Sequence, residues 1–278
     1  MALKLMYITK RPEIARIAER AGVDRIFVDM EYIGKADRQG GMDTVQSGHT
    51  LEDVANIKSA VKKAELLVRC NPIHNETSEY CSSEEEIDGI IQNGADVIML
   101  PYFKTAEEVE KFVECVGGRA KTMLLFETPD AVKNVDEILK ISGIDEVHIG
   151  LNDLSLGMGK KFMFELLIDG TVENLCCKVK EKGIPFGFGG VAAIGTGTLP
   201  AEKIITEHYR QGSSGVILSR SFCDCEKVES LDRIEEIFEK GIKEIRAFEN
   251  SLLKKDIDFE GNFSETKKII EGIISGMN

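Results

Sequence analysis

Short apolar runs alternate with amphipathic stretches along most of the chain. Strands are predicted at eight of these runs, 3–8, 25–29, 66–68, 97–100, 122–126, 146–149, 184–188 and 215–218. Helices are predicted at 12–21, 50–63, 84–92, 105–115, 129–139, 162–182 (interrupted at Gly170), 199–210, 228–253 and 265–274. The segment 150–163 is expected to be a loop. Strand and helix in regular alternation predict an α/β fold, a (β/α)8 TIM barrel, as one domain over 1–278.

A doubly wound open sheet is the competing architecture. No Gly-x-Gly-x-x-Gly turn follows the first strand, and eight regular units favour a closed barrel. Residues 226–278 exceed what one barrel needs. We expect this C-terminal helical extension to pack on a neighbouring subunit of a homo-oligomer. The alternative is a helix that folds back on its own barrel.

Composition narrows the class of partner. The chain has 35 Lys and Arg residues against 48 Asp and Glu, a formal net charge of −13, which argues against nucleic acid and an anionic membrane surface. Seven cysteines fit no zinc-ribbon spacing, so a reduced cytoplasmic protein is expected. Neither a signal peptide nor a membrane-spanning run is recognised. Cys223 and Cys225 could bind a soft metal, although no second pair or nearby histidine completes that site.

Two carboxylates follow neighbouring predicted strands. Glu127 comes directly after the strand at 122–126, and Asp153 follows the strand at 146–149 after a short interval. Because a helix joins the two strands, they should be parallel neighbours, and both acids should emerge at one end of the barrel. Two oxygen ligands with room for water and substrate suit Mg²⁺ or Mn²⁺, and Co²⁺ is also accepted. The alternative is a pair of solvated loop acids or helix caps.

Arg69 ends the third predicted strand and is a candidate anion-binding group. Its guanidinium can hold a carboxylate or a 2-keto acid at two points and stabilise a developing enolate oxygen. The alternative is a structural salt bridge to an acid such as Glu31. The other candidates for substrate binding, through backbone amides near the metal ligand, are Gly150, Leu151, Asn152 and Asp153.

Three histidines are placed by the pattern. His49 lies in the polar loop after the second strand and is a candidate acid–base group, although a lone loop histidine is more often solvated. His148 lies inside the sixth strand and is expected in the core or lining the barrel. His208 is expected on a surface helix.

The strand ends resemble those of the HpcH/HpaI aldolase/citrate lyase family. The resemblance rests on FVDMEY (27–32), LLVRCN (66–71), GADVIMLP (94–101), LLFET (124–128) and GIDEVHIGLNDLSLGMG (143–159). It implies a phosphoenolpyruvate/pyruvate-type barrel and a metal-dependent class II aldolase or lyase that forms the enolate of a 2-keto acid. Glu127 and Asp153 then match the metal ligands, Arg69 matches the enolate-stabilising arginine, and Asp29 and Glu31 match the acidic run.

The sequence departs from the family pattern at two places. Tyr32 stands where aldolases of the family usually have a histidine, and a long loop, 33–48, precedes His49. Either His49 folds back into the vacated position, or the proton transfer differs. Leu151 stands where aldolase members often have proline. The leading hypothesis is a metal-dependent carbon–carbon lyase. The alternatives are a citrate-synthase-like condensing enzyme and a barrel that binds a keto acid or sugar acid without turnover.

Overall fold

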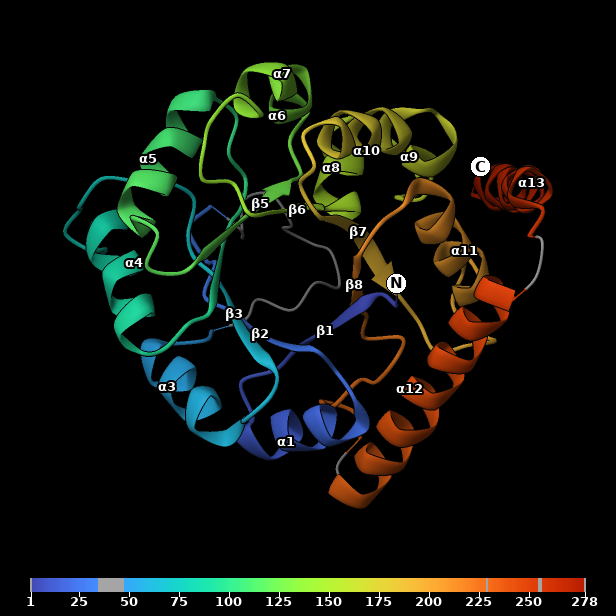
Figure 1. The fold of residues 1–278 in the computed structure, drawn as a ribbon, viewed down its shortest axis with the longest axis horizontal. Helices are drawn as coiled ribbons and strands as arrows, with labels where there is room; N and C mark the ends of the chain where they lie inside the picture. The colour runs from blue at the N-terminus through green and yellow to red at the C-terminus, as the bar shows by residue number, and fades with distance from the viewer. Residues whose placement is uncertain (1, 35–47, 229, 255–256, 278) are drawn as a thin grey trace.

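The barrel expected from the sequence is present. The computed structural model describes residues 2–34, 48–228, 230–254 and 257–277. Eight parallel strands close in sequence order, β8 pairing with β1, and helices surround them (Figure 1). The strands are β1 (Lys4–Ile8), β2 (Arg25–Asp29), β3 (Glu65–Arg69), β4 (Val97–Leu100), β5 (Lys121–Phe126), β6 (Glu146–Ile149), β7 (Phe186–Val191) and β8 (Gly215–Leu218).

The helices follow the strands around the outside of the barrel. They are α1 (Pro12–Ala21), α3 (Leu51–Ala60), α4 (Ser83–Gln92), α5 (Ala106–Val116), α6 (Pro129–Lys133), α7 (Val135–Ile138), α8 (Leu151–Gly157), α9 (Glu165–Ile168), α10 (Thr171–Glu181), α11 (Ala201–Gln211), α12 (Leu231–Lys254) and α13 (Phe259–Gly276). Capping boxes at Thr50, Ser82 and Thr105 fix the starts of α3, α4 and α5, because each side chain accepts from the third helical N–H.

Several boundaries differ from the prediction. The expected loop at 150–163 contains α8, which forms because Leu151 and Leu154 are buried against the barrel. The helix expected at 129–139 is divided at Asn134 into α6 and α7, whereas the interruption at Gly170 is confirmed. Strand β7 runs on into the expected glycine loop as far as Val191, and α13 starts earlier than expected, at Phe259.

Alternate residues of each strand face the barrel interior, which is arranged in layers. On β2, Arg25 lies at the amino-terminal end, Phe27 in the middle and Asp29 at the carboxyl end. Neighbouring strands contribute to the same layers, because the register pairs Arg25 with Glu65 and Asp29 with Arg69. The middle layer is an apolar cluster of Met6, Phe27, Leu67, Val97, Met99, Met123 and Leu125.

A charged cluster fills the amino-terminal layer of the barrel. The Arg25 side chain is fully buried and donates to Glu65 Oε2 at 2.6 Å and to both carboxylate oxygens of Glu146 at 2.8 Å. Lys4 and Lys121 pair with the same acids. Burial alone would raise the pKa of Glu65, but hydrogen bonds from Lys121 and Arg25 lower it to about 2. The cluster therefore links five strands through ion pairs.

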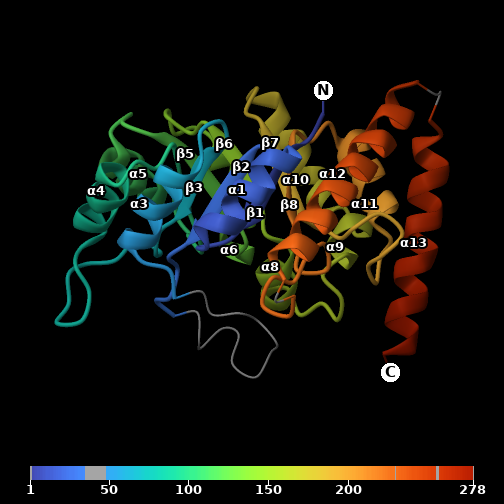
Figure 2. The same ribbon diagram turned by 90° about the horizontal axis from the view of Figure 1, so that it is seen from below.

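The C-terminal helices lie outside the barrel wall. Helix α12 packs against α1 and α11, and α13 lies outside α11 at the edge of the molecule (Figure 2). On α12, Glu249 accepts from the Leu3 backbone N–H at 2.7 Å, and Arg246 donates to the Leu3 carbonyl and pairs with Asp24. Helix α12 is thus joined to the start of β1 in its own chain. A role of residues 226–278 in subunit packing stays a prediction.

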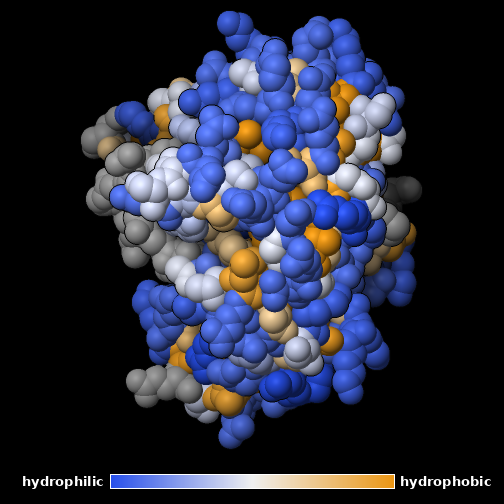
Figure 3. Space-filling view, turned by 90° about the vertical axis from the view of Figure 1, so that its left-hand side faces the viewer, coloured by the Kyte–Doolittle hydropathy of each residue, from blue (hydrophilic) through white to orange (hydrophobic). Residues whose placement is uncertain are grey.

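One face of the molecule is mostly polar, and one histidine of the outer helices is buried. The face that carries α3, α4 and α5 is predominantly hydrophilic, with smaller apolar areas (Figure 3). Among the described residues, no helix combines the length and apolar character needed to cross a bilayer. His208 lies on a helix outside the barrel, as expected, but α11 turns its side chain inward to stack on Phe188, with ring centroids 3.7 Å apart. Burial lowers the pKa of His208 well below its usual value, so the ring is neutral.

Removal of the buried arginine should strongly destabilise the barrel. Arg25→Met keeps much of the side-chain volume but removes the fully buried partner of Glu65 and Glu146, which leaves them only the more exposed Lys4 and Lys121. We expect the free energy of unfolding in urea to fall by about 3–5 kcal/mol. Arg20→Met is the control, because Arg20 pairs with Glu235 on the exposed surface, and its loss should stay under about 1 kcal/mol. Equal losses in the two variants would contradict the role assigned to the cluster.

Candidate active site

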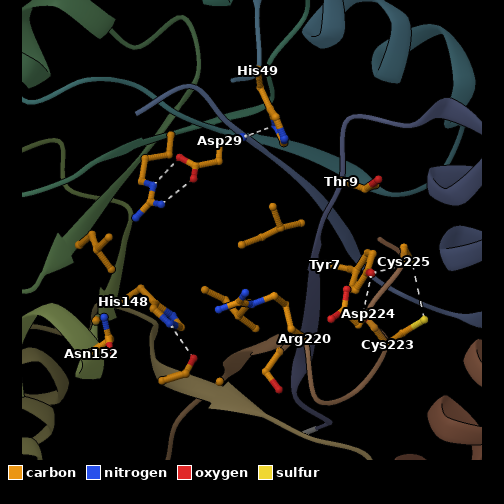
Figure 4. Close-up of a pocket in the computed structure, with 18 of the residues that line it drawn as sticks. Tyr7, Thr9, Asp29, His49, His148, Asn152, Arg220, Cys223, Asp224 and Cys225 are labelled. Carbon is orange, nitrogen blue, oxygen red and sulfur yellow. Dashed lines mark hydrogen bonds and ion pairs between the residues drawn. The ribbon is translucent and has the colours of Figure 1, made fainter. Parts of the chain in front are cut away.

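A pocket of about 450 Å³ opens at the carboxyl ends of the strands. The structure brings together almost all of the residues predicted for the site, which come from the ends of β2, β3, β5 and β6, from the residues just before α3 and from the start of α8. They are Asp29, His49, Arg69, Glu127, Gly150, Leu151, Asn152 and Asp153. Glu31 does not line the pocket and lies buried beside Arg69. Figure 4 shows His49 and Asp29 on one side, His148 and Asn152 on a second, and Tyr7 with Cys223 and Cys225 on a third.

Arg69 is held by the two acids of β2 and its loop. Its Nε and Nη2 atoms donate to the two carboxylate oxygens of Asp29, each at 2.8 Å, and Nη1 lies 3.3 Å from Glu31. Burial by itself would lower the pKa of Arg69, but Asp29, Glu31 and Glu127 outweigh it and raise that pKa well above its usual value. The ion pair expected with Glu31 therefore exists, and Asp29 is the stronger partner. Asp29 takes two of the five guanidinium N–H groups and Glu31 lies against a third, so two are left for a ligand.

Glu127 is buried and held in position from two sides. Its Oε1 accepts the Tyr102 backbone N–H at 3.0 Å. Tyr102 has a φ of 50°, a left-handed conformation that costs energy for a non-glycine residue. A Cβ atom added to Gly150 would lie 2.9 Å from Glu127 Cβ and Oε2. Glycine at 150 therefore leaves the room that this carboxylate occupies.

Asp153 faces the same pocket from the first turn of α8, and Asn152 Nδ2 donates to its Oδ1 at 3.0 Å. Glu127 and Asp153 are both oxygen donors, as Mg²⁺ and Mn²⁺ prefer. No group of three or more His, Cys, Asp or Glu side chains able to hold a metal occurs in the described part of the chain. A divalent ion here would take two ligands from the protein and others from water and substrate, and this donor set fits Mg²⁺.

The Gly150 amide is not available to a ligand. Its N–H donates to the Phe126 carbonyl at 2.9 Å, as part of the pairing of β5 and β6. Leu151 and Asn152 begin α8, and the first N–H groups of a helix have no partner within it. The backbone donors expected at 150–152 therefore reduce to Leu151 and Asn152.

His49 lies beside Asp29 and lines the pocket. The Asp29 backbone N–H donates to His49 Nδ1 at 2.9 Å, so Nδ1 is an acceptor and the neutral ring carries its hydrogen on Nε2. His49 can thus donate from Nε2, whereas accepting a proton there requires the other tautomer and loss of this bond. Tyr32, at the family's histidine position, is 47% exposed, packs against Tyr80 and does not line the pocket.

His148 confirms its predicted position in the barrel lining. Its Nε2 lies 3.1 Å from the Gly189 carbonyl oxygen and donates to it, because a carbonyl oxygen can only accept. Burial lowers the pKa of His148 to about 4, so the ring is neutral.

Strand-end reasoning missed Tyr7 and the segment after β1. Thr9, Lys10 and Arg11 line the pocket, and their place after an apolar run could have revealed them. Tyr7 carried no signal, because it lies inside a strand.

A parallel eight-stranded barrel with a charged pocket at its carboxyl end is the arrangement of TIM-barrel enzymes. Residues 4–165, more than half of the chain, match the HpcH/HpaI aldolase/citrate lyase family. The chain belongs to this family, which confirms the resemblance inferred from the strand ends. Membership places it among enzymes of the aldolase, lyase and synthase type.

Solved structures share the fold. An HpcH/HpaI aldolase from Desulfitobacterium hafniense DCB-2 has a TM-score of 0.60 and 19% identity, over 88% of this chain and 93% of that one. An HpcH/HpaI aldolase/citrate lyase family protein from Burkholderia cenocepacia J2315 has a TM-score of 0.61 and 14% identity, over 84% and 95%. Citrate synthase SbnG has a TM-score of 0.60 and 16% identity, over 84% and 94%. A search of curated proteins by sequence gave no significant match.

His148 should make the protein sensitive to acid. The pKa of His148 falls from 6.5 to about 4 on folding, so the unfolded chain binds the proton first as the pH drops. Stability is therefore unaffected above pH 6.5 and is lost between pH 6.5 and pH 4, by on the order of 3 kcal/mol. His148→Gln keeps a donor for Gly189 and removes the titration. Urea unfolding at pH 7 and pH 4 should show a smaller loss in the variant, and an equal loss would contradict this assignment.

Proposed function

We propose that the protein is a divalent-metal-dependent carbon–carbon lyase or aldolase that acts through the enolate of pyruvate or a related 2-keto acid. The observation that carries this proposal is the meeting of Arg69, Glu127 and Asp153 in one pocket. These residues also match, by resemblance, the family's enolate-stabilising arginine and metal ligands. A citrate-synthase-like condensation on the same enolate is the second candidate, and the likeness of the fold to citrate synthase SbnG supports it.

The oxygen donors of the pocket support a cation as part of the site. Glu127 and Asp153 bring two carboxylates to a pocket in which Asp29 and Glu31 already pair with Arg69. Glu127 and Asp153 would hold Mg²⁺ or Mn²⁺, and Co²⁺ is also compatible with these ligands. When bound, such an ion acts as a Lewis acid toward a carbonyl oxygen.

The chain's own residues would bind and orient the keto acid. The Arg69 guanidinium is fixed by Asp29 in a rigid fork, and its remaining N–H groups would stabilise the negative oxygen of the enolate. The backbone N–H groups of Leu151 and Asn152 would bind the carboxylate. Because Arg69 is held in place before substrate arrives, little reorganisation is needed during the reaction.

His49 would donate a hydrogen bond from Nε2 to a substrate oxygen. The bond from the Asp29 N–H to Nδ1 places the ring hydrogen on Nε2, and an imidazole in this tautomer can polarise a carbonyl as a donor. A role of His49 as the base, as expected from the sequence, requires that bond to break. The two roles predict different results for a glutamine at this position, because an amide can donate a hydrogen bond but cannot take up a proton.

Exchange of the pyruvate methyl protons in D₂O, followed by NMR, tests enolate formation. We expect exchange in the presence of Mg²⁺ or Mn²⁺, and a loss of at least a hundredfold in Glu127→Gln, because the amide replaces a charged ligand. If His49 only donates, His49→Gln should keep most of the exchange and His49→Ala should lose it. If His49 is the base, both variants should lose it.

Binding of pyruvate, measured by calorimetry on the same proteins, separates the remaining cases. Binding without exchange under any metal would contradict the lyase and support a keto-acid-binding barrel. If the protein neither binds pyruvate nor exchanges its methyl protons, the site takes another ligand.

Two glycines of the pocket provide a matched test of the carboxylate's position. Gly150→Ala would place a Cβ 2.9 Å from Glu127 Oε2, whereas a Cβ at Gly190 meets nothing closer than 3.4 Å. We expect Gly150→Ala to weaken Mn²⁺ binding at least tenfold, because the side chain of Glu127 must move. Gly190→Ala should bind Mn²⁺ as the wild type does. Electron paramagnetic resonance of free Mn²⁺ measures both, and equal affinities in the two variants would argue against Glu127 as a ligand.

A further inference from the structure

Two cysteines and a tyrosine form a cluster on the pocket wall that the proposed function does not use. The Sγ atoms of Cys223 and Cys225, in the segment after β8, are 3.5 Å apart. The Tyr7 hydroxyl, from β1, lies 2.9 Å from Cys225 Sγ and 3.0 Å from the Cys223 carbonyl oxygen. All three residues line the pocket, on the side away from His148 and Asn152 (Figure 4). Cys223 is buried, while Cys225 is partly exposed.

The surroundings of Cys225 favour its thiolate. The thiol of Cys223 can donate to Cys225, and Tyr7 and Arg11 add to this effect, against burial and the charge of Asp224. Together they lower the pKa of Cys225 to about 7. The pKa values of Tyr7 and Cys223 are raised in turn, so these two groups keep their hydrogens. The Tyr7 hydroxyl, which donates to the Cys223 carbonyl oxygen, also faces Cys225 Sγ and favours its thiolate.

Another cysteine of the chain provides a contrast. Cys81 is exposed as a residue, but its thiol loses part of its contact with water. This partial burial, together with the negative charges of Glu86 and Glu85, raises the pKa of the Cys81 thiol. Exposure alone therefore does not make a thiol of this chain reactive, and thiolate character separates Cys225 from Cys81.

We propose that Cys225 and Cys223 are a peroxide-reactive thiol pair that closes to a reversible disulfide in the wall of the pocket. The Cys225 thiolate attacks one oxygen of a hydroperoxide, ROOH, the O–O bond breaks, and the leaving RO⁻ takes up a proton as ROH. Sulfur is oxidised by two electrons to the sulfenic acid, and the peroxide is reduced. The Cys223 thiol then attacks this sulfur, the S–O bond breaks, and the disulfide forms with loss of water.

The position of the pair makes this second step local. The two sulfurs must approach from 3.5 Å to a bond length of about 2 Å, which a small movement of the Cys223–Cys225 segment provides. Formation of the disulfide between Cys223 and Cys225 removes the thiolate that the Tyr7 hydroxyl contacts. A soft-metal site was the other expectation for these cysteines. It has less support, because the described residues include no third Cys, His, Asp or Glu grouped with them as a ligand.

Mass spectrometry of the reduced, chelator-treated protein tests the proposal. Cleavage after Arg220 and Lys227 yields a peptide, 221–227, that contains both cysteines and no other. After brief treatment with a small excess of hydrogen peroxide and alkylation, we expect this peptide to lose two hydrogens and to regain them with dithiothreitol. Cys81 should remain alkylated and unoxidised. Absence of the disulfide, or equally fast oxidation of Cys81, would overturn the proposal.

Variants assign the order of the two thiols. Cys223→Ser should leave a sulfenic acid on Cys225 that dimedone traps, and Cys225→Ser should give neither disulfide nor adduct. Tyr7→Phe should slow alkylation of Cys225 several-fold at pH 7 and leave Cys81 unchanged, because a donor to the thiolate is lost. If the Cys223→Ser protein gives no dimedone adduct, the role of Cys225 as the attacking thiol is contradicted. If Cys225 of the Tyr7→Phe protein reacts at the wild-type rate, the role of Tyr7 is contradicted.

Discussion

A fully buried arginine, Arg25, ties the amino-terminal end of the barrel together. Arg25 binds acids from β3 and β6, so charges of opposite sign fill the layer where eight strands converge. An apolar layer around Phe27 and Leu67 lies above it and keeps water from the interior. The opposite end is left open, and the polar side chains there line a pocket. Barrel closure at one end and ligand access at the other are thus two results of the same strand alternation.

The second layer of charge, at the open end, sets the chemistry that the pocket can support. Asp29 and Glu31 hold Arg69 in place, and Glu127 and Asp153 add two further carboxylates to the same pocket. Strain at Tyr102 and the absence of a side chain at Gly150 fix Glu127 where a ligand can meet it. The strained backbone costs some free energy of folding, and in return it holds the carboxylate in position before a ligand binds. Strained residues often occur at functional sites for this reason.

The pocket has two chemically different walls. One wall, from β2 to α8, carries the arginine, the carboxylates and His49, which suit a small anionic substrate. The other, from β1 and the segment after β8, carries Tyr7 and the Cys223–Cys225 pair. Because both walls border one cavity, oxidation of the thiols would take place beside the bound substrate without changing a residue proposed to hold it.

The barrel, its strand order and most of the acids and bases of the pocket could be predicted from the amino-acid sequence, because strand periodicity and strand ends are local properties. The family could be inferred as well, from short motifs at those ends. Three features became clear only in the folded protein: α8 forms, His208 turns inward onto Phe188, and the Gly150 amide is used within the sheet. The hydrogen bond that fixes the tautomer of His49, and the approach of Tyr7 to Cys225, join residues far apart in the chain. Such contacts depend on how strands pack around the barrel, which no local pattern of residues encodes.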